Sequence, residues 1–106
     1  MSLGGPGYSK LEMQSYWRIH HEQNVLLVAA AGNAGTTAYS YPASYDTVMS
    51  VAAVDANNVH ASFSQSNDQV DIAAPGISIQ STLIGNRYVR LKRQKIPCEL
   101  PIKYLT

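Results

Sequence analysis

Two apolar runs without polar alternation constrain the fold more than any other feature of this sequence. The first, VLLVAAA, covers residues 25–31, and the second, TVMSVAAVD, covers residues 47–55. A strand with one face in water alternates polar and apolar residues, whereas a strand covered on both faces does not. The two runs therefore predict inner strands of a mostly parallel sheet, and VDIAAPG at residues 70–76 predicts a shorter third strand. The fold class that follows is α/β.

Residues 5–24 predict a helix that precedes the first run. Ser9 is a suitable N-cap with Glu12 at the spacing of a capping box, and Asn24 is a stop signal. The inward side of this helix has the spacing i, i+3, i+4, i+7 and consists of Met13, Tyr16, Trp17 and His20. One helix cannot cover both faces of a parallel sheet. We therefore expect the chain to need further parts of a larger domain in order to fold.

The charge distribution divides the 106-residue chain unevenly. Residues 1–86 carry two basic and six acidic side chains, a net charge of −4, and residues 87–106 carry six basic and one acidic, a net charge of +5. We interpret residues 1–88 as part of one domain and residues 89–106 as a divergent basic tail. The tail either binds an anionic partner or comes from a shifted reading frame, a retained intron or a mispredicted gene. It lacks interleaved aromatic residues, so neither nucleic acid nor membrane is an expected partner.

The first apolar run leads directly into Gly32-Asn33-Ala34-Gly35. Loops at the carboxyl ends of parallel strands are where α/β folds place their sites. From the residues alone, Asn33 is either a turn residue that tolerates left-handed geometry or a fixed amide donor at such a site. The single cysteine, Cys98, excludes an internal disulfide.

Several stretches together resemble the subtilisin-like serine proteases. They are MSLGGP, VAAAGNAG, YPASYDTVMSVAAVD, ASFSQSNDQVDIAAPGISIQSTL and GNRY, in the order and spacing of that family. The likeness covers about residues 1–88. It implies part of a three-layer subtilisin-like fold and the activity of a serine endopeptidase on extended protein segments. It also implies an extracellular protein, although the N-terminal residues do not form a signal peptide.

The resemblance assigns roles to individual residues. Asn33 matches the asparagine whose side chain donates a hydrogen bond to the oxyanion during peptide cleavage. Other matching residues contact substrate: Ser2, Leu3 and Gly4 pair with its backbone, Ala30, Ala31 and Gly32 form one wall of a side-chain pocket, and Ser40 lies near the base of that pocket. Ordinary packing is the alternative interpretation of these small residues.

Members of the family often bind calcium near the stretch YPASYDTV, and the resemblance also assigns ligands for this ion. The matching ligands are the backbone carbonyls of Ala43, Tyr45 or Asp46, and Val48, together with the Asp71 carboxylate. Oxygen ligands of this kind suit calcium. Solvated acidic side chains that bind no ion are the alternative.

The family's Ser–His–Asp triad is not expected in this chain. The matching Asp and His belong to segments before MSLGG, and the position of the serine falls near Lys95. His20, His21 and His60 are not placed near Asn33 by the pattern. We therefore predict a fragment of a serine endopeptidase that is inactive alone. The alternative is a non-catalytic pseudoenzyme or remnant that binds extended peptides.

Overall fold

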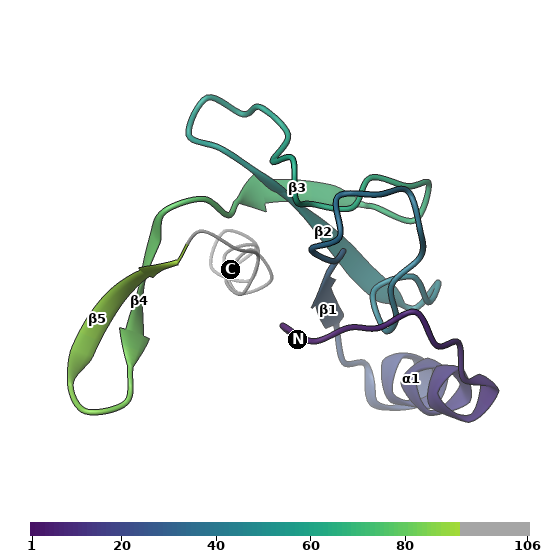
Figure 1. Cartoon of the computed structure of the whole chain (residues 1–106). Helices are drawn as coiled ribbons and strands as arrows, with labels where there is room; N and C mark the ends of the chain where they lie inside the picture. The colour runs from purple at the N-terminus through teal and green to yellow at the C-terminus, as the bar shows by residue number, and fades with distance from the viewer. Residues whose placement is uncertain (92–106) are drawn as a thin grey trace.

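A computed structural model describes residues 1–91 of the chain. Its centre is a three-stranded parallel sheet in the order β1-β2-β3 (Figure 1). The elements in chain order are α1 (Lys10–Gln23), β1 (Leu27–Ala30), β2 (Val48–Val54), β3 (Ile72–Pro75), β4 (Ile79–Leu83) and β5 (Arg87–Leu91). The α/β class with a parallel sheet is confirmed.

The helix begins and ends at the predicted caps. The Ser9 side chain accepts a hydrogen bond from the Glu12 amide at 3.3 Å, and Asn24 ends the helix in the left-handed conformation with φ of 53°. The Glu12 carboxylate does not close a reciprocal capping box, because it accepts hydrogen bonds from the hydroxyls of Tyr16 and Tyr45. The helix is thereby joined to the turn that precedes β2.

The sheet has a buried side chain layer on each face, as the lack of polar alternation predicted. Alternation along the strands separates the two layers. On one face Val28, Val51 and Ala74 form a cluster. On the other face Ala29 and Val48 are buried with Ala43 and Tyr45, and half-buried residues that include Met13 and Tyr16 of α1 pack against them. The helix therefore covers the second face.

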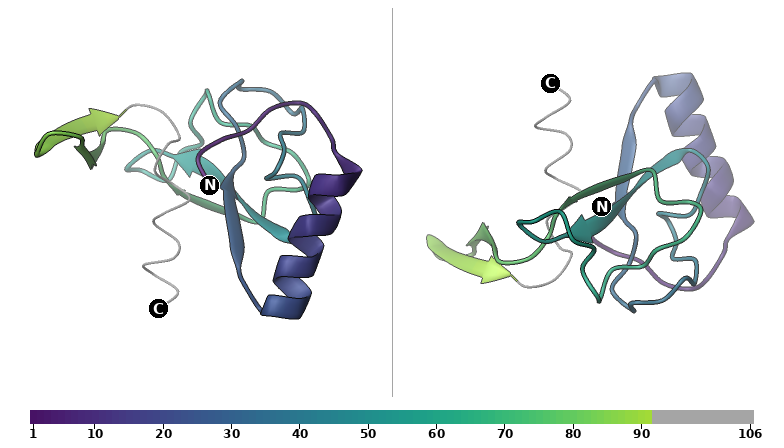
Figure 2. Two further views of the ribbon diagram at one scale, coloured as in Figure 1. Left: turned by 90° about the horizontal axis from the view of Figure 1, so that it is seen from below. Right: turned by 90° about the horizontal axis from the view of Figure 1, so that it is seen from above.

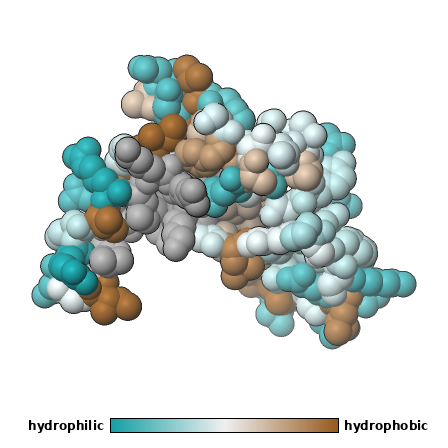
Figure 3. Space-filling view, viewed as in Figure 1, coloured by the Kyte–Doolittle hydropathy of each residue, from teal (hydrophilic) through white to brown (hydrophobic). Residues whose placement is uncertain are grey.

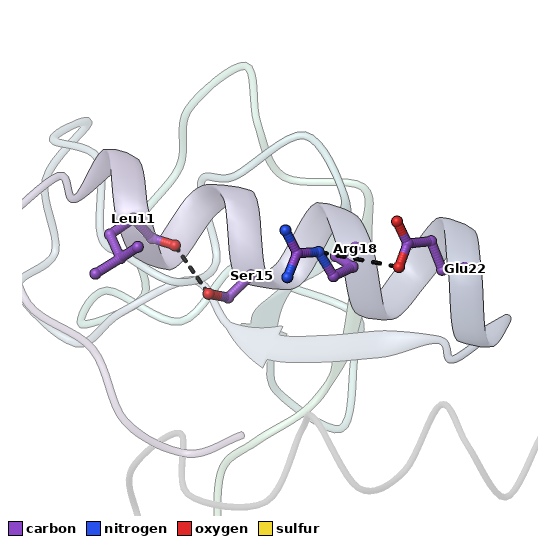
Figure 4. A network of polar contacts seen from close by, with 4 residues as sticks. All are labelled: Leu11, Ser15, Arg18 and Glu22. Carbon is purple, nitrogen blue, oxygen red and sulfur yellow. Dashed lines mark hydrogen bonds and ion pairs between the residues drawn. The ribbon is translucent and has the colours of Figure 1, made fainter.

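Trp17 was predicted on the inward side of the helix, but the structure leaves it exposed. Trp17 is 48% exposed, and its ring packs edge-on against His21 with centroids 4.5 Å apart. The outward surface of α1 carries local pairs along the axis: the Ser15 hydroxyl donates to the Leu11 carbonyl at 2.9 Å, and Arg18 Nε lies 3.9 Å from Glu22 Oε2 (Figure 4). Of the described helices, none has the length and apolar character to cross a membrane.

The β4–β5 hairpin was not predicted, and it lies apart from the parallel sheet. Its register runs from Ile79 opposite Leu91 to Leu83 opposite Arg87. Gly85 and Asn86 form the turn with positive φ angles of 89° and 55°. Two views show the hairpin and α1 at opposite ends of the molecule (Figure 2). β5 crosses residue 88, where we placed the boundary between the domain and its tail, and that boundary stays a prediction.

Hydrophobic residues on the visible surface are dispersed. The space-filling view shows them at separate places over the hairpin, over the loop between β2 and β3, and around α1 (Figure 3). Leu11 of the helix and Ile84 of the hairpin are 75% and 92% exposed.

Candidate functional site

A cleft of about 480 Å³ lies at the carboxyl end of β1. This is the end of the sheet where the sequence placed a site. Its lining combines small residues with a few polar groups: Ser2, Leu3, Gly4, Gly5, Pro6, Ala30, Gly32, Asn33, Ala34, Ala38, Tyr39, Ser40 and Gln65. Seven of the eight residues predicted for catalysis or substrate binding are thus brought together around one cavity.

The loop that carries Asn33 has a backbone that requires glycine at both flanks. Gly32 has φ of +123° and Gly35 has φ of +65°, a region that L side chains rarely adopt. An added Cβ at Gly35 would lie 2.5 Å from the Ser62 carbonyl oxygen, and one at Gly32 would collide with the Gln65 amide. The loop therefore presents Asn33, which is exposed, on a tightly held turn.

One wall of the cleft is the extended segment at residues 1–6. It is held at both ends: the Ala30 amide donates to the Met1 carbonyl at 3.1 Å, and Gly5 forms an antiparallel bridge with Tyr41. The wall approaches residue 40 closely, because a Cβ added at Gly4 would lie 2.6 Å from Ser40 Oγ. Ser2, Leu3 and Gly4 are exposed on this wall.

Ala31 is the one predicted substrate residue outside the lining. Its side chain is 1% exposed, and its amide donates to the Val51 carbonyl at 2.9 Å, which fixes the end of β1 against β2. Among the described residues, no histidine and no carboxylate lines the cleft. His20 lies 3.0 Å from the Val25 carbonyl oxygen, and His60 forms a bridge with Val54. Lys95, the position matched to the serine, lies outside the described residues.

Gln65 is a lining residue that the sequence interpretation did not single out. Its side chain is 5% exposed, and its Oε1 accepts a hydrogen bond from the Ala34 amide at 2.8 Å. The sequence contained a weak signal for it, since a long polar side chain follows Phe63-Ser64 in an otherwise small and polar turn. Only the folded arrangement places it against the loop of Asn33.

Tyr39 lies on the cleft rim beside an acid. Its hydroxyl donates to Asp68 Oδ1 at 2.8 Å, and this hydrogen bond raises the pKa of Tyr39. The carboxylate favours the neutral phenol over its charged form.

The predicted calcium ligands lie in the turn before β2, at Val48, which begins β2, and at Asp71, the residue before β3. In the turn, the Val48 amide donates to the Tyr45 carbonyl at 2.9 Å. The Asp71 carboxylate accepts a hydrogen bond from the Ser50 amide at 2.7 Å, which holds it beside the start of β2. A carboxylate and backbone carbonyls each keep further lone pairs after such bonds, and oxygen donors of this kind suit a hard cation. No group of three His, Cys, Asp or Glu residues suited to a metal occurs among the described residues.

A sequence model of the Subtilase family matches residues 1–95. The chain belongs to the subtilase family. This subtilase chain is 48% identical over 94 residues to a thermostable alkaline protease of Halalkalibacterium halodurans, a match that covers 86% of the chain and 25% of the relative. It is 45% identical over 91 residues to subtilisin BL of Lederbergia lenta, covering 86% of the chain and 34% of the relative.

Solved structures agree with this assignment. The psychrophilic subtilisin-like protease Apa1 of Pseudoalteromonas sp. AS-11 superposes with a TM-score of 0.73 at 52% identity, covering 83% of this subtilase chain and 22% of Apa1. The prenylagaramide maturation protease PagA superposes with a TM-score of 0.82 at 30% identity, covering 90% and 35%. The chain thus spans about a quarter to a third of the length of the curated relatives it matches.

Proposed function

We propose that this subtilase segment supplies the oxyanion donor and part of the substrate cleft of a serine endopeptidase, with Asn33 as the donor. One observation carries the proposal: Asn33 lines the same cleft as Ser2, Leu3 and Gly4. The carbonyl of a peptide held along that wall gains negative charge during attack. An amide donor fixed in advance stabilises that charge more than it stabilises the ground state.

The remaining parts of the proposal extend to the whole protein. The Ser–His–Asp triad comes from segments of the protease other than the described residues. Calcium binds at the carbonyls of Ala43, Tyr45 or Asp46, and Val48 with the Asp71 carboxylate, and it stabilises the turn before β2. The protease acts outside the cell, on extended protein substrates. A purely peptide-binding remnant has less support, because the relatives named above are proteases.

A chimeric protease tests the role of Asn33 in a complete catalytic domain. The chimera is the thermostable alkaline protease with residues 1–88 of this chain in place of its own matching segment, since the family likeness extends that far. Asn33→Ala is expected to lower kcat on a peptide anilide by about 100- to 1000-fold, a scale already known for the oxyanion donor of a subtilisin and adopted from it. KM is expected to change little, because the donor acts mainly on the transition state.

The matched control is Asn57→Ala, which removes an exposed side chain amide in the turn after β2. We expect this variant to keep the kcat of the chimera within about twofold. A kcat for Asn33→Ala as high as that of the control would contradict the proposed role. A chimera that folds but does not cleave the anilide would contradict the claim that this segment serves a working cleft.

A further inference from the structure

The loop of Asn33 is paired with a second segment that follows β2. The Gly35 amide donates to the Phe63 carbonyl at 2.8 Å, and the Ser66 amide donates to the Thr36 carbonyl at 3.1 Å. Between these two bonds lies Gln65, whose amide donates to the Gly32 carbonyl at 3.3 Å. The loop after β1 is therefore held by the chain that returns from β2, about thirty residues later in the sequence.

Gln65 holds the residues on both sides of Asn33. Its backbone amide bonds to Gly32, and its side chain Oε1 accepts from the Ala34 amide at 2.8 Å. Its side chain also occupies the space above Gly32 where a Cβ would otherwise project. A single residue that is 5% exposed thus holds the backbone on both sides of the amide donor, through its backbone amide before Asn33 and through its side chain after it.

Gln65 is itself anchored to the sheet. The neighbouring Ser64 is 1% exposed, and its Oγ accepts a hydrogen bond from the Ala53 amide of β2 at 2.9 Å. The Ala61 amide donates to the Ala53 carbonyl at 2.9 Å. Hydrogen bonds therefore connect β2, through Ser64 and Gln65, to the loop of Asn33.

We propose that Gln65 is a positioning residue for the oxyanion donor, and that its side chain sets the orientation in which Asn33 meets the substrate carbonyl. This inference rests on the proposed role of Asn33. A donor must be held closely to its productive geometry, and displacement by a fraction of an ångström reduces the stabilisation it provides. A neutral amide suits the position, because a carboxylate there would add negative charge near the developing oxyanion.

The test uses the chimeric protease and a double-mutant cycle with Asn33. Gln65→Leu keeps the approximate size of the side chain and removes the acceptor for the Ala34 amide. We expect kcat to fall by about tenfold with KM nearly unchanged, since misplacement affects the transition state most. In an Asn33→Ala background the same change is expected to lower kcat by less than about twofold, because the group that Gln65 positions is then gone.

The matched control is Gln69→Leu, the same chemical change four residues further along the same loop and outside the cleft lining. It should leave kcat within about twofold in both backgrounds. Gln65→Met, which keeps the length of the side chain, replaces Gln65→Leu if the leucine variant does not fold.

Three results would contradict the positioning role of Gln65 or the proposed function of Asn33, and they distinguish one from the other. A Gln65 variant with unchanged kcat, alongside a large loss for Asn33→Ala, would refute the positioning role and leave the proposed function standing. Equal losses with and without Asn33 would show that Gln65 acts by general stability. Unchanged kcat in both Asn33→Ala and the Gln65 variant would refute the proposed function itself.

Discussion

The loop of Asn33 requires glycine at position 32, because the observed backbone leaves no room for a side chain there. The backbone φ of +123° is accessible to glycine with little cost, and the space above its Cα is filled by the Gln65 amide. Two independent constraints, the dihedral angle and the contact, thus meet at one position next to the proposed oxyanion donor.

Gly32→Ala in the chimeric protease is therefore expected to lower both stability and turnover. Strain at such a backbone position costs about 1–3 kcal/mol, and the displaced Gln65 amide would also disturb the neighbouring donor. Urea unfolding of the inhibited enzyme measures the first effect and kcat measures the second. Gly7→Ala is the matched control, because a Cβ at that glycine meets no atom within 4 Å. Equal stability of the two variants would show that the close contact at Gly32 does not matter.

Among the elements, α1 and the turn before β2 are joined by one buried phenol. The Tyr45 side chain is 3% exposed, and its hydroxyl accepts from the Ser9 amide at 3.0 Å and lies 2.9 Å from Glu12 Oε2. Burial raises the pKa of Tyr45, and the Glu12 carboxylate raises it further. Tyr16, which lies against the same carboxylate, has its pKa raised by burial first and by Glu12 second.

A raised tyrosine pKa means that the folded state favours the neutral phenol. Its contribution to stability is complete below the unfolded pKa of about 10 and is lost as the pH rises through the folded pKa. We expect the free energy of unfolding of the chimera to fall as the pH rises above about 10, and Tyr45→Phe to make this fall smaller. At about pH 8 the same variant should be less stable by roughly 1–2 kcal/mol, because its hydrogen bonds are lost.

The control for this pH dependence is Tyr88→Phe in the hairpin, where the side chain is 71% exposed. That variant should show the same fall with pH as the parent chimera. If Tyr45→Phe also leaves the slope unchanged, the buried phenol is not the group that links stability to alkaline pH.

On the scale of the whole molecule, the proposed calcium ligands connect parts of the chain that are far apart in sequence. Residues 43–48 run from the turn before β2 into the first residue of β2, and Asp71 lies before β3 with its carboxylate 2.7 Å from the Ser50 amide. An ion held by both would stabilise the folded state by an amount that grows with the logarithm of the calcium concentration divided by the Kd. The gain is about 2.7 kcal/mol at a calcium concentration 100 times the Kd.

Asp71→Asn is expected to reduce the rise in unfolding temperature that calcium produces in the chimera, because the amide keeps an acceptor for Ser50 but loses the charge. Asp55→Asn is the matched control, since Asp55 also accepts backbone hydrogen bonds at a turn, from Asn57 and Val59. The unfolding temperature of each variant is measured with calcium present and after calcium has been removed with a chelator. An unchanged calcium effect in Asp71→Asn would exclude this carboxylate as a ligand.

Local features of the sequence determined most of the elements. The run at residues 25–31 predicted β1, which is shorter at its start, where Val25 and Leu26 are 41% and 51% exposed. The caps Ser9 and Asn24 fixed the ends of α1, since capping depends on residues within one turn of each other. The hairpin was not predicted, because its strands lack the continuous apolar run that marks β1 and β2, and its local signal is the Gly85-Asn86 turn alone.

Only the tertiary structure decided how the cleft is held together. The sequence predicted a site at the end of β1 and named Asn33, because a strand end and a glycine-flanked polar residue are visible in a few consecutive letters. It did not reveal Gln65, whose bond to Ala34 joins residues 31 apart in sequence. It also could not show that the Asp71 carboxylate bonds to the Ser50 amide, because these residues are 21 apart in sequence. Short-range patterns determined which elements form, whereas contacts between distant segments determined which side chains meet.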